Sequence, residues 1–348
     1  MDEIFMKRCF DLARLGAGAV SPNPMVGAVL VHEGRIIGEG WHQRYGQAHA
    51  EVNCVAAVQD SDRNLIADST LYVSLEPCCF HGKTPACTDL ILRERIPRVV
   101  IASLDETPEV AGKGIEILRK AGIAVLTGFC ASEKRLPSEF RNVFAAQHRP
   151  FVQLKFAKSV DGYMGIPGQQ VWFSNHFSQV VAHKGRSEFD AILIGTATAL
   201  TDNPSLTNRF WFGKSPLRLV LDKQRRLPEH LKIFQDGHVT WVVCEKKLAK
   251  DRNTSTLQYM ELDFDENLLD KLLALLYQHQ ISSLIVEGGA ITLQQFLDKG
   301  LWDEAAIFST GKRLGKGILA PTPLGTVLAN HQLGTDTLTI LRNQANGR

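Results

Sequence analysis

The sequence predicts an α/β protein built from two domains, and three observations lead to that expectation. First, at roughly 100–200 residues per domain, a chain of 348 residues is long enough for two separate cores. Second, short apolar runs alternate with segments of helical periodicity, which is typical of strands joined by crossover helices. Third, this alternation stops before Arg149-Pro150 and starts again after it, so we place the domains at residues 1–146 and 147–348.

The first domain is expected to begin with a helix at 2–15, because its apolar residues recur at helical spacing. Two apolar runs at 26–31 and 35–40 are separated by His32-Glu33-Gly34, which favours a β-hairpin. Strands and helices then alternate, which implies a sheet that is at least partly parallel. Helices are predicted at 48–58, 86–95 and 112–121, and strands at 70–74, 98–103 and 123–127.

The second domain repeats this alternation. Ser174 stands directly before its first helical segment and is expected to cap that helix. Strands are predicted at 151–156, 191–194, 217–222, 239–243, 283–287 and 305–309, and helices at 176–188, 266–280 and 291–297.

Composition and charge exclude several classes of protein. Apolar residues make up 44% of the chain and charged residues 22%, so disordered and coiled-coil classes are excluded. Up to residue 146 the chain has 16 basic and 18 acidic residues, and after it 23 basic and 19 acidic residues. Neither part therefore has the basic excess of a non-specific nucleic-acid binder. No apolar run approaches the roughly 20 residues that cross a bilayer, and the first residues do not resemble a signal peptide.

Seven cysteines, four of them between Cys54 and Cys87, indicate reduced thiols and a metal site in a cytoplasmic enzyme. His49-Ala50-Glu51 opens a predicted helix, while Cys78 and Cys87 lie between a strand and a helix. One imidazole and two thiolates suit zinc and leave its fourth position for water, whose pKa falls to about 7. Glu51 is expected to be the catalytic acid–base group that moves protons from this water to a departing amine.

This arrangement matches the pattern H-x-E followed by P-C-x-x-C, which is the signature of zinc-dependent base deaminases. It departs from the pattern in one respect, since eight residues separate Cys78 from Cys87. The alternative is a structural zinc site closed by a fourth ligand, for which Cys54, Cys79 and His81 are candidates. That alternative leaves Glu51 without a role.

Several longer motifs resemble the bifunctional deaminase–reductase family of bacterial riboflavin biosynthesis. They are Ser-Pro-Asn-Pro-Met-Val-Gly at 21–27, Gly-Trp-His at 40–42, the segments 49–51 and 77–87, Gly-Lys-Gly at 112–114, and then 155–162, 195–204 and 287–289. The resemblance covers nearly the whole chain. It implies a cytidine-deaminase-like three-layer domain followed by a dihydrofolate-reductase-like α/β domain.

The resemblance also implies two consecutive reactions. The first is zinc-dependent hydrolytic deamination of 2,5-diamino-6-ribosylamino-4(3H)-pyrimidinone 5′-phosphate. The second is NADPH-dependent reduction of the ribosyl side chain to ribityl, which gives 5-amino-6-(5-phosphoribitylamino)uracil. The partner is then a small phosphorylated pyrimidine rather than a nucleic acid or a membrane, and a homo-oligomer, either dimer or tetramer, is expected.

Five residues are predicted to contact the deaminase substrate. Asn23 lies between two prolines, and its amide is suited to reading a pyrimidine edge. His42, His81 and Lys83 are candidates for holding the phosphate or the ring. Asp105 follows a predicted strand and either receives a ribose hydroxyl or caps a turn. Lys83 and Ala86 stand where the family usually has arginine and proline, and the lysine keeps the charge without the bidentate geometry.

No G-x-G-x-x-G fingerprint follows a strand in the second domain, and its glycine turns are individually weak signals. The resemblance assigns nicotinamide-cofactor contacts to Ala157, Trp172, Thr198, Asp202, Lys223, Gly289, Ala290, Ile291, Thr292, Leu293, Gln294 and Gln295. It assigns substrate contacts to Gln170, Arg186, Leu206, Arg209 and Glu287. The two arginines suit a ribose 5′-phosphate, whereas Gln170 and Lys223 stand where the family often has serine.

Two other functions compete with this interpretation. A deaminase acting on a base in tRNA or DNA would share the zinc site, but it would need a basic, aromatic-lined channel for the strand. Alternatively, the second domain is a degenerate module that binds its ligand without reducing it. NADPH oxidation in the presence of deaminated substrate separates that possibility from a true reductase.

Overall fold

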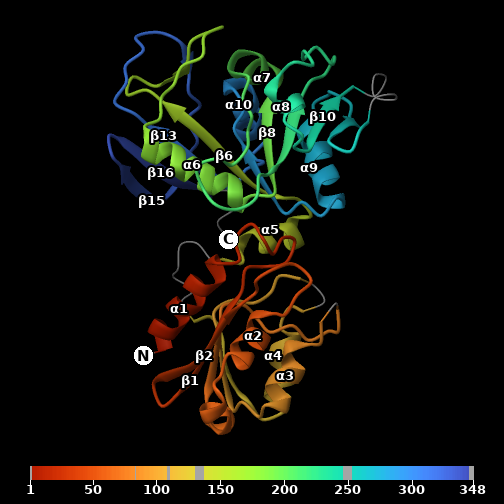
Figure 1. Ribbon diagram of the computed structural model, residues 1–348, viewed down its shortest axis with the longest axis vertical. Coiled ribbons are helices and arrows are strands. Elements are labelled where there is room, and N and C mark those ends of the chain that lie inside the picture. The colour runs from red at the N-terminus through yellow and green to blue at the C-terminus, as the bar shows by residue number, and fades with distance from the viewer. Residues whose placement is uncertain (1, 83, 108–109, 130–136, 246–252, 345–348) are drawn as a thin grey trace. The chain divides into compact units, whose positions relative to one another are not determined.

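The structure is a computed structural model that describes residues 2–82, 84–107, 110–129, 137–245 and 253–344. The chain divides into two compact units, Met1–His148 and Arg149–Arg348 (Figure 1). None of the described helices has the length and hydrophobicity of a membrane-crossing segment.

The first unit contains a five-stranded sheet in the order β2-β1-β3-β4-β5. Its strands are β1 (Gly27–His32), β2 (Arg35–Trp41), β3 (Thr70–Val73), β4 (Arg98–Ile101) and β5 (Ala124–Leu126). β1 and β2 form the predicted antiparallel hairpin, and both Glu33 and Gly34 at its turn have positive φ, as a tight hairpin turn requires. β3, β4 and β5 run parallel, so the partly parallel sheet is confirmed.

Helices cover both faces of this sheet and give three layers (Figure 1). Because side chains alternate along a strand, Val29 and Val31 of β1 pack against one layer and Ala28 and Leu30 against the other. The first layer is α1 (Asp2–Arg14), and the second consists of α2 (Ala50–Ala56), α3 (Cys87–Arg93) and α4 (Lys113–Lys120). The 3₁₀ helix at Asp60–Asp68 and α5 (Glu139–Gln147) were not predicted.

The described part of the second unit contains a nine-stranded sheet in the order β11-β10-β9-β8-β12-β6-β13-β16-β15. The strands from β11 to β13 are parallel, and β16 and β15 add an antiparallel hairpin at one edge. The strand bounds are β6 (Phe151–Lys158), β8 (Ala191–Gly195), β9 (Leu217–Leu221), β10 (Thr240–Cys244), β11 (Leu257–Glu261), β12 (Ser283–Val286), β13 (Glu304–Ser309), β15 (Gly325–Leu333) and β16 (Asp336–Asn343), with β7 (Tyr163–Gly165) and β14 (Ile318–Leu319) in a small separate sheet.

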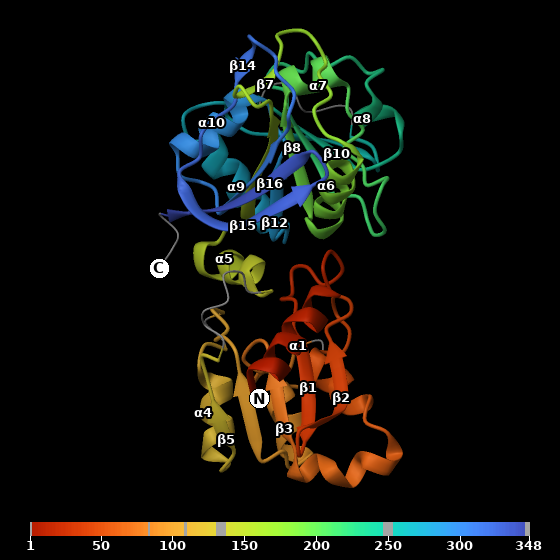
Figure 2. The same ribbon diagram turned by 90° about the vertical axis from the view of Figure 1, so that its left-hand side faces the viewer.

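Helices lie on both sides of the large sheet (Figure 2). α9 (Leu268–Gln278) and α10 (Ala290–Asp298) pack their leucines and Phe296 into the main core. α6 (His176–Glu188) lies on the other side, where Val181 packs beside Phe308. Two short helices, α7 (Thr196–Asp202) and α8 (Lys232–Gln235), complete the unit as described. Parallel strands bring the segments that follow β6, β8, β9 and β12 to one edge of the sheet.

All the elements predicted for both domains are present, with ends shifted by a few residues. The predicted helix cap was wrong: Asn175, not Ser174, is the N-cap of α6, and its side-chain oxygen accepts a hydrogen bond from the Ser178 N–H at 3.0 Å. Sequence reasoning missed β7, β11, β14, α7, α8 and the β15–β16 hairpin. β15 is partly exposed along its whole length, so it lacks the apolar alternation by which strands are predicted.

Arg149, the first residue of the second unit, is buried and held inside that unit. Its guanidinium donates to both carboxylate oxygens of Asp303, at 2.6 and 2.8 Å, and to the Pro150 carbonyl at 2.8 Å. Asp303 directly precedes β13 and also accepts the Val152 N–H at 2.8 Å. This ion pair therefore ties the start of β6 to the start of β13.

Candidate active sites

In the first unit, the structure brings His49, Cys78 and Cys87 together from three different elements. His49 is the N-cap of α2, Cys87 is the first residue of α3, and Cys78 lies in the loop after β3. One potential ligand atom from each lies within 4.8 Å of the other two. The His49 Nδ1 is 3.4 Å from the Cys78 Sγ and 3.3 Å from the Cys87 Sγ.

Among the described residues, no fourth histidine, cysteine or carboxylate joins this cluster. Cys54 instead donates its thiol to the Gly38 carbonyl at 3.3 Å, and burial raises its pKa. His81 pairs with Asp89 at 3.0 Å, and its side chain is 71% exposed. The arrangement fits a centre with three protein ligands and an open position rather than a closed structural site.

The cluster favours a thiolate at Cys78. Hydrogen bonds from the Cys87 thiol and from His49 hold the pKa of Cys78 well below its ordinary value, and the Cys87 backbone N–H also donates to the Cys78 Sγ at 3.3 Å. A thiolate is the form in which cysteine binds a metal.

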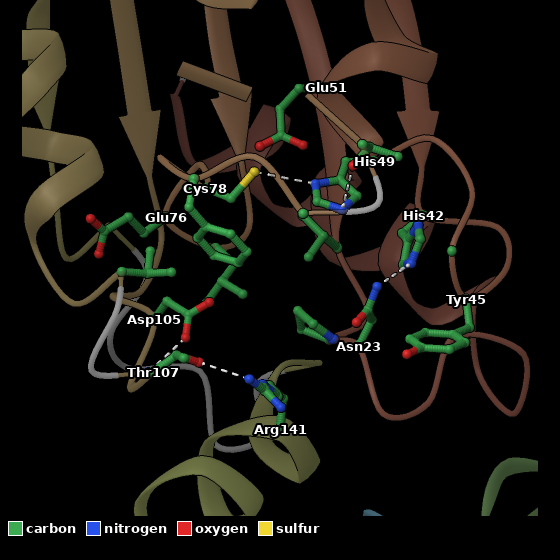
Figure 3. A pocket seen from close by; sticks show the side chains of 18 of the residues that line it. Asn23, His42, Tyr45, His49, Glu51, Glu76, Cys78, Asp105, Thr107 and Arg141 are labelled. Carbon is green, nitrogen blue, oxygen red and sulfur yellow. Dashed lines mark hydrogen bonds between the residues drawn. The ribbon is translucent and has the colours of Figure 1, made fainter. Parts of the chain in front are cut away.

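Glu51 lies in the first turn of α2, and its carboxyl group faces the cluster (Figure 3). The residue is 3% exposed. Burial raises the pKa of Glu51, and the negative charge of Cys78 raises it further. A carboxyl group that keeps a proton closer to neutral pH is suited to exchanging protons with a substrate.

His49, Glu51 and Cys78 line a cavity of about 200 Å³ (Figure 3). Asn23, His42 and Asp105, which were predicted as substrate contacts, all line it. His81 is not among the lining residues, and Lys83 lies outside the described residues. The Asp105 carboxylate accepts the Thr107 N–H at 2.8 Å, so this residue lines the cavity and also caps a turn.

Asn23 and His42 form an ordered pair at the cavity wall. The His42 Nδ1 is 3.0 Å from the Ala48 carbonyl, and its Nε2 is 3.2 Å from the Asn23 side-chain nitrogen. Burial lowers the pKa of His42, which favours the neutral ring. In that form Nδ1 donates to Ala48 and Nε2 accepts from Asn23, which leaves the Asn23 side-chain oxygen as an acceptor.

Glu76 explains the Gly-Lys-Gly motif at 112–114. Its buried carboxylate accepts the N–H groups of Gly112, at 2.9 Å, and Ile115, at 3.3 Å, at the start of α4. A Cβ atom at Gly114 would lie 2.3 Å from the Pro77 carbonyl oxygen, so only glycine fits there. This close approach fixes the backbone directly before Cys78.

In the second unit, Glu287 follows β12 and is enclosed by cations. Its carboxylate accepts from the Arg186 Nε and Nη2 at 3.0 and 2.8 Å and from the Lys155 Nζ at 3.3 Å. Burial alone would raise the pKa of Glu287, but Arg186 and Lys155 outweigh burial and lower it to about 2. The group is therefore an anion at every physiological pH.

Arg186 and Arg209, two predicted substrate contacts, meet at Thr207. Arg186 donates through Nη1 to the Thr207 carbonyl at 3.2 Å, and Arg209 donates through Nη1 to the Thr207 hydroxyl at 3.2 Å. Arg209 is exposed, whereas the side chain of Arg186 is only 12% exposed. Leu206, also a predicted contact, directly precedes Thr207 and is buried, with φ of +57°.

Glycines at the strand ends form a tight cradle beside α10. A Cβ at Gly195 would lie 2.8 Å from the Thr292 Oγ1, one at Gly288 would lie 2.8 Å from the Thr292 Cβ, and one at Gly289 would lie 3.1 Å from the Thr198 Oγ1. Gly289 is the N-cap of α10. Backbone can thus approach a ligand closely here, and the N–H groups at the start of α10 favour an anion.

The other predicted cofactor contacts lie in varied surroundings. Trp172 is 67% exposed, and its carbonyl accepts from Lys312. Asp202 ends α7, where burial raises its pKa, and its carbonyl accepts from the Gln170 amide at 3.1 Å. Lys223 lies 3.7 Å from Glu245. The remaining predicted cofactor contacts are Ala157 on β6 and five residues of α10. Of these five, Ala290 is half-buried, Leu293 packs in the core, and Ile291, Gln294 and Gln295 are exposed.

Two family models match the chain. The zinc-binding region of cytidine and deoxycytidylate deaminases matches residues 1–103, and the RibD C-terminal domain matches residues 150–338, which is more than half of the chain. The chain belongs to the RibD family.

Curated RibD relatives match over nearly their full length. The riboflavin biosynthesis protein RibD of Aquifex aeolicus is 38% identical, with 91% of this chain and 89% of the relative covered. The RibD of Bacillus amyloliquefaciens is 37% identical, with 92% and 87% covered. The solved Thermotoga maritima diaminohydroxyphosphoribosylaminopyrimidine deaminase/5-amino-6-(5-phosphoribosylamino)uracil reductase is 34% identical, with a TM-score of 0.88 and 98% of both chains covered.

This RibD chain is therefore a bifunctional deaminase and reductase of riboflavin biosynthesis, and the predicted fold class and enzyme classes are confirmed. Neither the nucleic-acid deaminase nor the degenerate binding module is supported by these matches.

Several residues at the two RibD sites were missed by sequence reasoning. Arg141 lines the first cavity and donates to the Thr107 hydroxyl at 3.1 Å, but it lies on the unpredicted α5. Lys155 belongs to a recognised motif, yet nothing in the pattern indicated its contact with Glu287. His183 on α6 contacts the backbone of Arg209 at 2.8 Å, and a single histidine on a helix carries no signal of such a contact.

Proposed function

We propose that the first unit deaminates a 2,5-diamino-6-ribosylamino-4(3H)-pyrimidinone 5′-phosphate and that the second reduces the deaminated product with NADPH. The domains proposed for these steps are 1–146 and 147–348. The observation that carries the proposal is the cluster of His49, Cys78 and Cys87 together with the buried Glu51, since His49, Cys78 and Glu51 line one cavity. The name of the Thermotoga maritima relative supplies the substrate class.

The donor set of the first site fits zinc. One imidazole and two thiols converge, a thiolate is favoured at Cys78, and no fourth ligand joins them in the described chain. We infer that His49, Cys78 and Cys87 hold the ion. When bound, zinc supplies Lewis acidity that makes water nucleophilic near neutral pH.

Glu51 is then the general acid–base group of the deamination. Water adds at the amino-bearing ring carbon, the carbon–nitrogen bond breaks, and ammonia leaves while the ring keeps the oxygen. Glu51 takes a proton from the water and delivers it to the departing amine, for which its raised pKa is suited. The Asn23 oxygen accepts a hydrogen bond from an N–H at the pyrimidine edge, because the hydrogen bond to His42 turns the side-chain nitrogen toward the His42 ring and leaves the oxygen available.

The second site fits a nicotinamide cofactor by shape. The cradle of Gly195, Gly288 and Gly289 admits close backbone contact, Thr198 and Thr292 border it, and α10 begins directly after Gly289. NADPH, when bound, supplies the reducing equivalents for the ribose C1′. Exposed Arg209 binds the substrate 5′-phosphate, while Glu287 orders Arg186 and Lys155 beside it.

Product identification tests both halves. Supplied with the diaminopyrimidinone phosphate alone, the enzyme is expected to release ammonia and accumulate the ribosylaminouracil phosphate. With NADPH added, the ribityl product is expected together with NADPH oxidation, and metal analysis is expected to find about one zinc per chain, as three-ligand catalytic sites hold. Active protein without zinc, or no NADPH oxidation with deaminated substrate, would contradict the proposal. The homo-oligomer and the cytoplasmic location stay predictions.

A further inference from the structure

His183 is a buried imidazole that the proposed reactions do not use. It lies on α6 and is 5% exposed. Its Nδ1 accepts a hydrogen bond from the backbone N–H of Arg209 at 2.8 Å, and its ring meets the edge of Phe210 with centroids 4.7 Å apart. A ring nitrogen that accepts a hydrogen bond carries no hydrogen, so His183 acts here as a neutral ring.

α6 holds the segment around Arg209 at two points. His183 and Arg186 are three residues apart and therefore share one face of the helix. Arg186 holds the Thr207 carbonyl, and His183 holds the Arg209 N–H. Asn208, which lies between Thr207 and Arg209, makes its hydrogen bonds within its own loop. Its N–H donates to the Ser215 hydroxyl at 3.0 Å, and its side-chain oxygen accepts from the Trp211 N–H at 3.2 Å. His183 thus sets the position of the Arg209 backbone.

The charges around His183 suit a phosphate. Lys155, Arg186 and Arg209 are three cations, and Glu287 supplies one anion, which leaves a net charge of +2. A phosphate monoester carries about −1.5 to −2 at neutral pH. Burial, together with Arg186 and Arg209, lowers the pKa of His183 to about 4, so the ring keeps its acceptor nitrogen without adding charge.

We propose that His183 is a positioning residue of the reductase, which anchors the Arg209 backbone so that the guanidinium meets the 5′-phosphate of the substrate. The inference rests on the proposed function, because it takes the substrate to be phosphorylated. Arginine binds phosphate through a planar fork, and this contact depends on the direction from which the side chain approaches. The position of the Arg209 backbone therefore governs how tightly the phosphate is held.

Steady-state reductase kinetics of full-length His183→Leu test the proposal. With the ribosylaminouracil phosphate, KM is expected to rise about 3- to 10-fold, as loss of one hydrogen bond implies. The kcat and the KM for NADPH should stay within about two-fold of the wild-type values. With the dephosphorylated ribosylaminouracil, His183→Leu and the wild type should have the same KM. His183→Asn, whose side-chain oxygen can replace Nδ1 as the acceptor, should restore most of the affinity.

Two comparisons separate positioning from a general loss of packing. Lys184→Ala removes a neighbouring side chain of α6 that lies 5.6 Å from the ring of Trp211 in the same loop, and it should behave as the wild type. In the double variant His183→Leu/Arg209→Ala, KM should differ little from that of Arg209→Ala alone, because the Arg209 guanidinium that His183 positions is already absent. Thermal unfolding and the KM for NADPH report whether the second unit of each variant is folded, and ammonia release reports on the first unit. If His183→Leu does not fold, His183→Gln replaces it in the test. The Gln amide lies one carbon farther from the backbone than that of Asn, so the same rise in KM for the phosphorylated substrate is expected.

The outcomes distinguish this proposal from the proposed function. A wild-type enzyme that does not oxidise NADPH with either substrate overturns the proposed function itself. A wild type that prefers the phosphorylated substrate, with a His183→Leu variant of unchanged KM, overturns only the role of His183. Equal losses with both substrates, or an equal loss in Lys184→Ala, show that His183 merely packs and also overturn it.

Discussion

Glu51 in the first unit and Glu287 in the second are both buried beside a proposed reaction centre, yet their pKa values move in opposite directions. Burial raises the pKa of Glu51, and the negative charge of Cys78 adds to the rise by more than His49 offsets it. Burial acts in the same direction on Glu287, but Arg186 and Lys155 bring its pKa down to about 2.

The difference shows that burial alone does not decide the charge of a carboxyl group; its partners do. Glu51 has neighbours that let it gain and lose a proton, which a deaminase requires. Glu287 has neighbours that keep it ionised, so it organises cations and is unsuited to proton transfer at neutral pH. The two sites use the same residue type for different work.

The largest effect is expected for Glu51→Gln, which keeps the side-chain shape and removes the proton carrier. Ammonia release should fall by at least about 100- to 10,000-fold, the usual contribution of a general acid–base group. Zinc content should be unchanged, because His49, Cys78 and Cys87 remain. NADPH oxidation with the already deaminated substrate should match the wild type. Loss of both activities in a folded, NADPH-binding variant would show that the two units do not work independently.

The reverse pattern is expected for Asp202→Asn combined with Arg209→Ala. Charge-assisted hydrogen bonds contribute about 1.5–3 kcal/mol each, so kcat/KM of the reductase should fall by roughly 100-fold or more. Ammonia release should continue, and chromatography should show the ribosylaminouracil phosphate accumulating unreduced. Normal formation of the ribityl product would remove these residues from the reductase site.

The smallest effect in this series concerns the stability of the second unit in Glu287→Gln. A carboxyl with a pKa of about 2 in the folded chain, against the ordinary value of 4.5, contributes on the order of 3 kcal/mol to the free energy of unfolding. This contribution is complete above pH 4.5 and is lost as the pH falls toward 2. Denaturant unfolding should therefore show the variant less stable than the wild type at pH 7, with the difference shrinking at acidic pH.

Glu51→Gln is the matched control for that measurement, because the pKa of Glu51 is raised rather than lowered in the folded chain, so its ionised carboxylate adds no stability at neutral pH. It should show no comparable loss of stability at pH 7. Equal losses in the two variants would mean that burial, and not the cationic partners, distinguishes the two glutamates.

The same contrast explains what the sequence could reveal. Metal chemistry requires particular residue types at short spacings, so the cluster of His49, Cys78 and Cys87 and the nearby Glu51 are recognisable in the amino-acid sequence alone. The contacts of Glu287 are not, because Lys155 lies 132 residues away and Arg186 lies 101 residues away along the chain. Their meeting depends on the order of parallel strands, which apolar periodicity does not encode.

Fold prediction met a similar limit. The buried strands were predicted, because each is a short apolar run in the sequence. β15 was missed, because none of its residues is buried and polar residues interrupt its sequence. Ser174 and Asn175 are both good cap residues and stand side by side, so composition does not choose between them. The extended backbone of Asn175, with ψ of 177°, decides in its favour.

The buried pair of Arg149 and Asp303 determines where the protein can be cut. Arg149 comes one residue before the match to the RibD C-terminal domain begins, yet its guanidinium belongs to the core of that unit. A fragment starting at Pro150 would lack the guanidinium that pairs with the buried Asp303 carboxylate, and removal of one partner of a buried ion pair costs about 3–5 kcal/mol. Anyone who dissects this enzyme into separately expressed halves must therefore begin the second half at Arg149 or earlier.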